Sequence, residues 1–375
     1  MSRTTTLCLF AIAILLMPIS WQSVSELRTT YERSAQAAAY ASTAEKAEGE
    51  KRYFLAIEAY QKALSLTGLN EGWTRRLTRL QCVVSAQDPK TLSPAAAQKL
   101  ALRIKTAQLT PKDGPEIAVA LAQIELIDGR VGTAHAAFEK AGTQYPKSAL
   151  AQFVLGKSRL FRGNSSGAID ALSRAVKLEG NDFIYRALLG RTLHQHEKWA
   201  RAEDELAAAA ELKEDGMIRL LLGEARLKLH KINAAIDALQ AAQGLLDKPR
   251  ERARALAGLG FAQYQAGRFR EAVSSLSESD RLSPTSLTRL NLARAYQGIN
   301  DHRRAANIFE QVLESRPLDG ANHVNWVRSL MALGQRIRAQ QIYVALKKRS
   351  ESRPTLSKSV AAMAVIVDMA ATPAK

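Results

Sequence analysis

The chain has 375 residues, and its 53 Lys and Arg exceed its 36 Asp and Glu to give a formal net charge of +17. That excess indicates either a solvated basic surface or an anionic partner, such as an acidic protein tail, a lipid headgroup surface or an acidic polymer. Nucleic acid is disfavoured because the sequence has no recognition motif, no zinc-ligand spacing and no regular aromatic platform. Only Cys8 and Cys82 are present. We expect Cys82 to be a small core residue without a disulfide partner.

Residues 1–25 have the pattern of an export segment. Arg3 and the amino terminus precede an apolar stretch from Leu7 to Met17, which Pro18 interrupts. The stretch is short for a membrane span but fits the apolar core of a signal peptide. A cleaved signal peptide and a retained membrane anchor both stay open. In either case we expect the rest of the chain to be periplasmic, or anchored in the inner membrane and facing the periplasm.

The remainder of the chain is dominated by a repeat of about 34 residues. Seven small residues recur at intervals of 33 to 37 positions: Ala134, Ala168, Ala202, Ala235, Ala272, Ala305 and Ala339. Four residues after each comes a bulky apolar residue: Phe138, Leu172, Leu206, Leu239, Leu276, Phe309 and Tyr343. Twelve residues before six of them comes a second small residue: Ala122, Gly156, Gly190, Gly223, Gly260 and Ala293. This period and alternation predict stacked helix-turn-helix units.

The pattern resembles the tetratricopeptide repeat (TPR). Residues 267–272 and the run from Tyr53 to Ala63 are similar to that family's inter-helix turn and second helix, and Pro146, Pro284 and Pro317 each follow a repeat alanine by twelve residues. The resemblance implies an all-α, right-handed superhelical solenoid that binds partners and catalyses nothing. We therefore predict a non-enzyme without cofactor or metal.

In chain order, we predict a helical lead-in over 26–36 and two repeats over 37–114, of which the second is degenerate. Its two helices are separated by a long loop over 87–92, and Ser93-Pro94 has the pattern of an N-cap. Seven tandem repeats follow over 115–353. The interval of 37 predicts three extra residues near 246–249, which would disturb the superhelix and could separate two sub-arrays. Residues 354–375 are expected to form a capping helix and a tail.

Two histidines are candidate metal ligands, because His194 and His196 lie close together in the sequence. On a helix, residues two apart point about 200° apart, so they cannot share an ion. We predict that both are exposed polar residues at the end of a repeat's first helix.

The candidate binding site follows from the resemblance, since the first helix of each TPR lines a concave groove. The residue after the small position of each first helix, a position that Val327 fills in the last repeat, would face it: Gln123, Lys157, Arg191, Glu224, Phe261, Arg294 and Arg328. Asn291 and Asn325 stand three residues before the last two, on the same helix face. Asn beside a cation is similar to the family's clamp for peptide backbones and carboxylates. We predict partner binding by Lys157, Arg191, Arg294, Arg328, Asn291, Asn325 and Phe261; a merely solvated inner face is the alternative.

A second candidate patch is apolar and contains Phe153, Leu160, Phe161, Phe261 and Tyr264. These residues are either core between repeats or lining of the groove. Taken together, the sequence predicts a scaffold for protein–protein interactions in a cell-envelope assembly, such as secretion, pilus or polysaccharide-export machinery, that binds an acidic or C-terminal peptide segment. A soluble periplasmic adaptor or assembly chaperone, and a binding module for an anionic polymer, are the alternatives.

Overall fold

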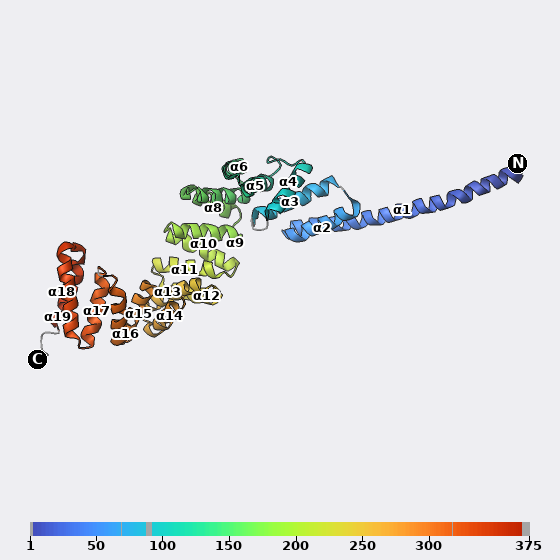
Figure 1. Cartoon of the computed structure of the whole chain (residues 1–375). Coiled ribbons are helices and arrows are strands. Elements are labelled where there is room, and N and C mark those ends of the chain that lie inside the picture. The colour runs from blue at the N-terminus through green and yellow to red at the C-terminus, as the bar shows by residue number, and fades with distance from the viewer. Residues whose placement is uncertain (1–2, 69, 88–91, 317, 370–375) are drawn as a thin grey trace. The chain divides into compact units, whose positions relative to one another are not determined.

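The computed structural model describes residues 3–68, 70–87, 92–316 and 318–369, with side chains from Ser23 onward except those of Val24 and Met369. All of the regular structure in these ranges is helical (Figure 1), so the all-α prediction is confirmed. The chain divides into two compact units, Met1–Glu179 and Gly180–Lys375. Each unit is described by itself.

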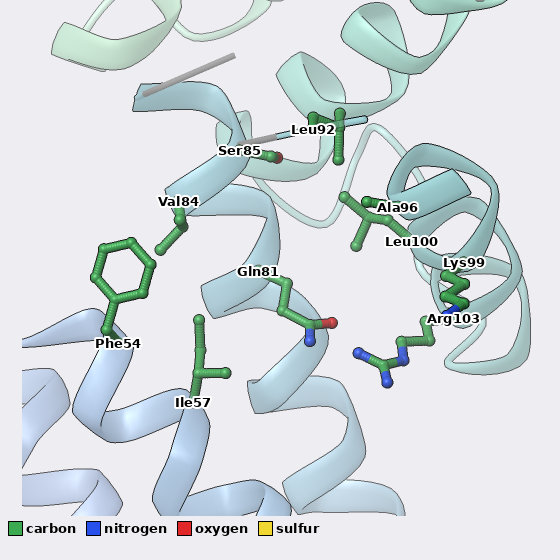
Figure 2. Close-up of a pocket in the computed structure, with 10 residues that line it drawn as sticks. All are labelled: Phe54, Ile57, Gln81, Val84, Ser85, Leu92, Ala96, Lys99, Leu100 and Arg103. Atoms are coloured by element: carbon green, nitrogen blue, oxygen red, sulfur yellow. The ribbon is translucent and has the colours of Figure 1, made fainter. Parts of the chain in front are cut away.

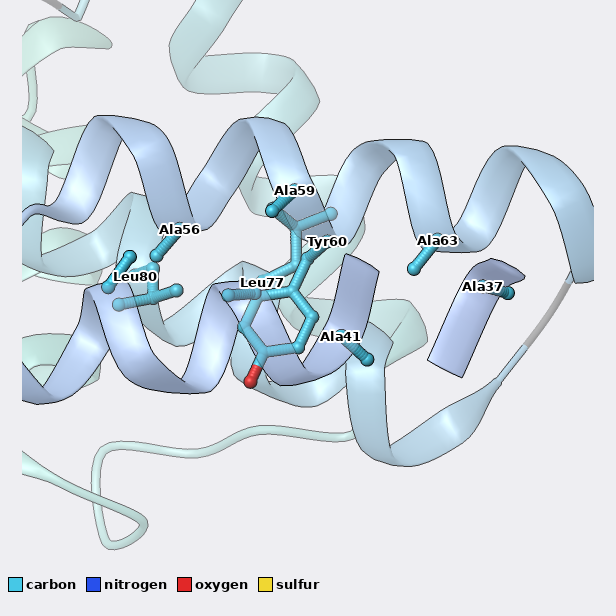
Figure 3. Close-up of a cluster of buried hydrophobic side chains, with 10 residues drawn as sticks. Ala37, Ala41, Ala56, Ala59, Tyr60, Ala63, Leu77 and Leu80 are labelled. Carbon is cyan, nitrogen blue, oxygen red and sulfur yellow. The ribbon is translucent and has the colours of Figure 1, made fainter. Parts of the chain in front are cut away.

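The first unit begins with a long helix, α1 (Arg3–Gly49), which packs against α2 (Tyr53–Thr67). Alanines of both helices, together with Leu77 and Leu80 of the next helix, surround the fully buried ring of Tyr60 (Figure 3). The Tyr60 hydroxyl accepts a hydrogen bond of 3.2 Å from Arg76 Nη1. Small side chains let the two helices approach closely, so a single aromatic ring fills the layer between them.

The helix α1 continues through position 18, where Pro18 ends the apolar stretch of the sequence. The predicted export segment begins at residues outside the described chain, and most of its side chains are not described. In the part of the chain that the structure describes, no helix has both the length and the apolar character needed to cross a membrane.

The degenerate repeat consists of α3 (Glu71–Gln87) and α4 (Pro94–Thr106). The Ser93 side chain accepts a hydrogen bond from the Ala96 N–H at 3.3 Å, which confirms the predicted N-cap. Two regular helix pairs complete the unit: α5 (Pro115–Ile127), α6 (Val131–Gln144), α7 (Ala149–Phe161) and α8 (Ser165–Leu178).

The second unit contains five helix pairs and a cap. The pairs are α9 (Phe183–Gln195), α10 (Trp199–Leu212), α11 (Gly216–Lys228), α12 (Ile232–Leu245), α13 (Pro249–Gln265), α14 (Phe269–Leu282), α15 (Ser286–Gly298), α16 (His302–Leu313), α17 (Gly320–Ala332) and α18 (Arg336–Ser352). A short 3₁₀ turn, Pro354–Leu356, leads into α19 (Ser357–Met369). Leu356 and Met363 are buried against Val327 and Leu330 of α17, so this helix covers the apolar edge of the last repeat.

The predicted small and large residues interlock within each hairpin. A Cβ added at Gly260 would lie 2.5 Å from Leu276 Cγ, and one at Gly190 would lie 2.8 Å from Leu206 Cγ. Both leucines are completely buried. The first helix of these repeats must therefore carry glycine where the leucine of the second helix meets it.

The three extra residues of the long interval lengthen a helix. The loop before α13 spans only 246–248, whereas α13 has 17 residues and the first helices of the neighbouring repeats have 13. The insertion is close to one helical turn of 3.6 residues and extends α13 at its start. The disturbance of the superhelix at 246–249 stays a prediction. The boundary between the two units lies at Glu179, elsewhere in the chain.

Candidate partner-binding groove

One open cavity of about 570 Å³ lies in the second unit, along the first helices of four successive repeats. We call it the groove. Its lining comes from α9, α11, α13 and α15, with one residue from the start of α10: His194, Trp199, Glu224, Leu227, Lys228, Arg254, Ala257, Gly258, Phe261, Leu287, Thr288, Asn291 and Arg294. Equivalent helices stack side by side in a solenoid, so one face of each contributes to the same surface.

The apolar part of the groove has large side chains that face solvent. Leu287 is 67% exposed, and the Trp199 and Phe261 rings line the same cavity. Lys228 Nζ lies 5.7 Å from the centroid of the Trp199 ring, which is within the range of a cation–π contact. The groove thus combines half-buried aromatic rings and an exposed leucine with a nearby cation.

A fixed ion pair crosses the groove between α11 and α13. Arg254 donates to both carboxylate oxygens of Glu224, from Nε to Oε1 and from Nη2 to Oε2, each at 2.6 Å. His194 Nε2 lies 3.1 Å from Glu224 Oε2, although it is not oriented for a hydrogen bond. Burial acts to raise the pKa of Glu224, but His194 and Arg254 outweigh it and lower that pKa overall. Glu224 is thus a carboxylate at neutral pH, and Arg254 balances it.

The remaining cations of the groove are Lys228 and Arg294, and neither forms an ion pair within the described residues. Arg294 is held in place by amides: its Nε and Nη2 lie 3.2 and 2.9 Å from Asn322 Oδ1, and its Nη1 lies 3.3 Å from Asn291 Oδ1. These contacts use three of the five guanidinium donors and leave two for a ligand. Two cations without an acidic partner among the described residues give this part of the groove a local excess of positive charge.

Three of the seven predicted site residues, Phe261, Asn291 and Arg294, line the groove. Arg328 donates to Asn325 Oδ1 at 3.2 Å on α17, so the second predicted Asn–Arg pair forms, but neither residue reaches this cavity. Arg191 is exposed on α9 outside the lining. Lys157 belongs to the first unit and lines a smaller cavity there.

The prediction for His194 is wrong. Its side chain is only 13% exposed because it packs edge-on against the Trp199 ring, with centroids 5.1 Å apart, and lies against Glu224. Glu224 belongs to the next repeat, so residue spacing within α9 alone does not predict this contact. In the described ranges, no cluster of three or more His, Cys, Asp or Glu side chains could hold a metal ion.

Sequence reasoning also missed Arg254 and Leu287 as groove residues. They stand seven residues before Phe261 and Arg294, which places them two helical turns away on the same face. The sequence did indicate these residues, because positions three, four and seven residues apart on a first helix lie on the same face and therefore also line the groove. Trp199 had no such signal, because it begins a second helix.

The first unit has a concavity of about 310 Å³ where the degenerate repeat leaves space between α2, α3 and α4 (Figure 2). Phe54 and Ile57 of α2 lie on one side, and Lys99 and Arg103 of α4 lie on the other. Phe54 is 71% exposed. None of the predicted site residues lies in this concavity.

Comparison with protein families identifies the repeats. Residues 153–216 and 220–286 match one tetratricopeptide repeat model, and residues 288–318 match another. These segments are therefore similar to tetratricopeptide repeats. A search of curated proteins finds no match.

Several solved structures have a similar helical fold. One is YrrB, described as a TPR protein with an unusual peptide-binding site. It is 19% identical in sequence to this chain, the match covers 49% of this chain and 94% of YrrB, and the TM-score is 0.44. MamA is 24% identical over 44% of this chain and 90% of its own, with a TM-score of 0.41. PilF of Pseudomonas aeruginosa is 18% identical over 56% and 95%, with a TM-score of 0.44. At these identities the similarity concerns the fold alone.

Proposed function

We propose that this protein is a non-enzymatic TPR scaffold whose groove holds an acidic or carboxylate-bearing segment of a partner protein. The observation that carries the proposal is the composition of the groove. Half-buried Trp199 and Phe261 and exposed Leu287 lie in the same cavity as Lys228 and Arg294, which no carboxylate of the described chain balances. Tetratricopeptide repeats generally serve as binding scaffolds, and this cavity crosses four successive repeats.

The ligand chemistry follows from what each part of the groove can satisfy. A carboxylate paired with Arg294 would receive charge-assisted hydrogen bonds, and each such bond contributes about 1.5–3 kcal/mol. The Glu224–Arg254 pair is satisfied internally, so it leaves the binding of a ligand carboxylate to Lys228 and Arg294. A segment that combines one large apolar residue with one acidic residue therefore fits better than a uniformly charged chain.

Lys228 is the residue to change in a test, because its loss disturbs nothing buried. Removal of Arg294 would instead leave Asn322 Oδ1 without a hydrogen-bond donor, although Asn322 is only 5% exposed. An unpaired buried acceptor of this kind costs about 1–3 kcal/mol of stability. We expect Lys228→Glu to reduce capture of the partner from solubilised envelope membranes by tenfold or more. The melting temperature should not change. The matched control is Lys348→Glu, an exposed lysine on α18 with the same change of charge.

Equal loss of capture by the two variants would refute the groove, since bulk positive charge would then explain binding. Loss by neither would place the partner elsewhere on the chain. The alternative of an anionic polymer predicts a different salt response. Binding held by released counterions weakens steeply as salt is raised, whereas a partly apolar groove retains much of its affinity.

We further propose that the scaffold works in a cell-envelope assembly, of the secretion, pilus or polysaccharide-export kind, with its repeats on the periplasmic side. The support is the basic start and apolar stretch of residues 1–25. A soluble periplasmic adaptor or assembly chaperone has the same export requirement. An alkaline phosphatase reporter fused after Lys375 should be active in the periplasm. An inactive reporter on a well-folded cytosolic chain would refute the location and leave the groove proposal intact.

A further inference from the structure

A smaller cavity of about 240 Å³ lies in the first unit between α5, α6 and α7. Its lining includes Gln123 of α5, His135 and Phe138 of α6, and Ser158 and Phe161 of α7. We call it the side pocket. It is separate in sequence from the groove, because every residue that lines it precedes the second unit.

Two polar atoms of the side pocket have no hydrogen-bond partner within the described residues: Gln123 Oε1 and His135 Nε2. Gln123 is only 6% exposed and His135 only 7%. The other ends of both side chains are bonded, since Gln123 Nε2 donates to the Ala86 carbonyl at 3.3 Å and His135 Nδ1 lies 2.7 Å from Ser158 Oγ. Buried polar atoms nearly always have partners, so two unpaired atoms at one cavity indicate a ligand that supplies them.

A hydroxyl group fits these two atoms when the Ser158 hydroxyl is the donor in its contact with His135 Nδ1, an arrangement that the 2.7 Å distance allows. When the Ser158 hydroxyl donates to His135 Nδ1, the imidazole carries its proton on Nε2 and needs an acceptor. Gln123 Oε1 needs a donor, because its amide nitrogen is the end that bonds the Ala86 carbonyl. One hydroxyl meets both needs, since its oxygen accepts from His135 and its hydrogen goes to Gln123. A methyl group meets neither need, and a carboxylate would place two acceptors against Gln123.

The walls of the side pocket require that this hydroxyl belongs to an aromatic side chain. The His135 ring stacks on Phe161 at 4.8 Å and 21°, and Phe138 approaches it edge-on at 6.3 Å. Phe161 is nevertheless 72% exposed. Water alone would satisfy the polar atoms but would leave the Phe161 ring uncovered, whereas an aromatic ring stacked on Phe161 would remove it from solvent.

We propose that the side pocket receives the side chain of a tyrosine in the partner protein. The tyrosine would bury its ring against Phe161 and place its hydroxyl between Gln123 Oε1 and His135 Nε2. This inference rests on the proposed function in so far as the tyrosine belongs to the segment that the scaffold holds. The first unit then has its own role in recognition, in addition to the role of the groove in the second unit.

The test uses p-cresol, which reproduces the tyrosine side chain, with the full chain and ligand-observed NMR titration. The controls are toluene, which lacks the oxygen, and 4-methylanisole, which lacks the hydroxyl hydrogen. We expect p-cresol to bind at least about tenfold more tightly than either control, because a site built around a hydroxyl rejects analogues that leave its polar atoms unpaired. In Gln123→Met the preference should disappear while toluene binding persists. The persistent toluene binding shows that the pocket is still folded.

N-acetyl-tyrosinamide distinguishes a protein tyrosine from a free phenol, and it should bind at least as tightly as p-cresol. Three results would overturn the proposal: no saturable binding, which leaves the pocket to water; equal binding of p-cresol and toluene; and binding of p-cresol but not of N-acetyl-tyrosinamide. None of them affects the groove, because Lys228→Glu should leave p-cresol binding unchanged. A failure of the groove is thus measured separately from a failure of the side pocket.

Discussion

Gly260→Ala tests the packing of the repeats most directly. The added Cβ would lie 2.5 Å from Leu276 Cγ and 3.2 Å from the Ala272 backbone oxygen. Leu276 is completely buried and cannot move aside without disturbing its neighbours. Overpacking of this kind costs about 1–3 kcal/mol. An alanine in a helix interior returns about 1 kcal/mol relative to glycine. We expect a net loss of up to about 2 kcal/mol, measured by urea unfolding with far-UV circular dichroism.

A second substitution reverses the sign of the effect. Leu276→Ala alone should cost about 2–5 kcal/mol because it leaves a cavity. In that background Gly260→Ala should stabilise the chain by at most about 1 kcal/mol, since the gain in helix propensity is opposed only by the 3.2 Å contact with the Ala272 oxygen. Gly244→Ala is the matched control, because a Cβ at this helical glycine meets nothing within 4 Å. Amide hydrogen exchange in α13 and α14 gives a local measure if the array unfolds in parts. A Gly260→Ala variant as stable as Gly244→Ala would refute the interlocking of glycine and leucine.

Two titratable groups give further predictions. Burial is the main cause that raises the pKa of the Cys82 thiol to about 12 from its ordinary 9.0. In a Cys8→Ser background, a disulfide reagent should therefore label the folded chain slowly and the urea-unfolded chain rapidly. The same shift means that stability falls as pH rises above 9.0, because the unfolded thiol ionises first. Rapid labelling of the folded chain would contradict the burial of Cys82. Burial lowers the pKa of His323 from 6.5 despite its contact with the Asp319 carbonyl. Below pH 6.5 the unfolded chain therefore takes up the proton first and the free energy of unfolding falls. His323→Gln should remove that part of the acid dependence, and identical pH profiles for both proteins would contradict it.

The sequence was sufficient to predict the helices because the repeat marks each one more than once. The small and large residues place the two helices of a hairpin, and turn residues mark where they join. The turns of four repeats contain Gly129, Gly163, Gly267 and Gly334, with positive φ. Glu197, His230 and Asn300 adopt the same backbone conformation in the other three repeats. Glycine is thus preferred at this position without being required, so the turn alone would have missed three units.

The groove could be predicted only in part, because the period locates a face but does not say which side chains meet across it. Asn291 and Arg294 share a helix, so their contact follows from spacing. Arg254 and Glu224 stand 30 residues apart in neighbouring repeats. Their pairing depends on the rotation between those repeats, which no local pattern encodes. The same rotation places Asn322 against Arg294 and so fixes a cation that spacing alone would leave mobile.

The pairing of small with large residues also accounts for why the repeats tolerate variation at their tightest contact. Where the first helix carries glycine, at 156, 190, 223 and 260, the residue sixteen positions later is leucine. Where it carries alanine, at 122 and 293, that residue is phenylalanine. Ala293 and Phe309 are both completely buried in one cluster. A leucine branches at Cγ and fills the space that a Cβ would need, whereas a flat ring can lie beside that Cβ. Shape at the two positions is therefore matched as a pair, and this matching sets how closely the two helices of each hairpin can pack.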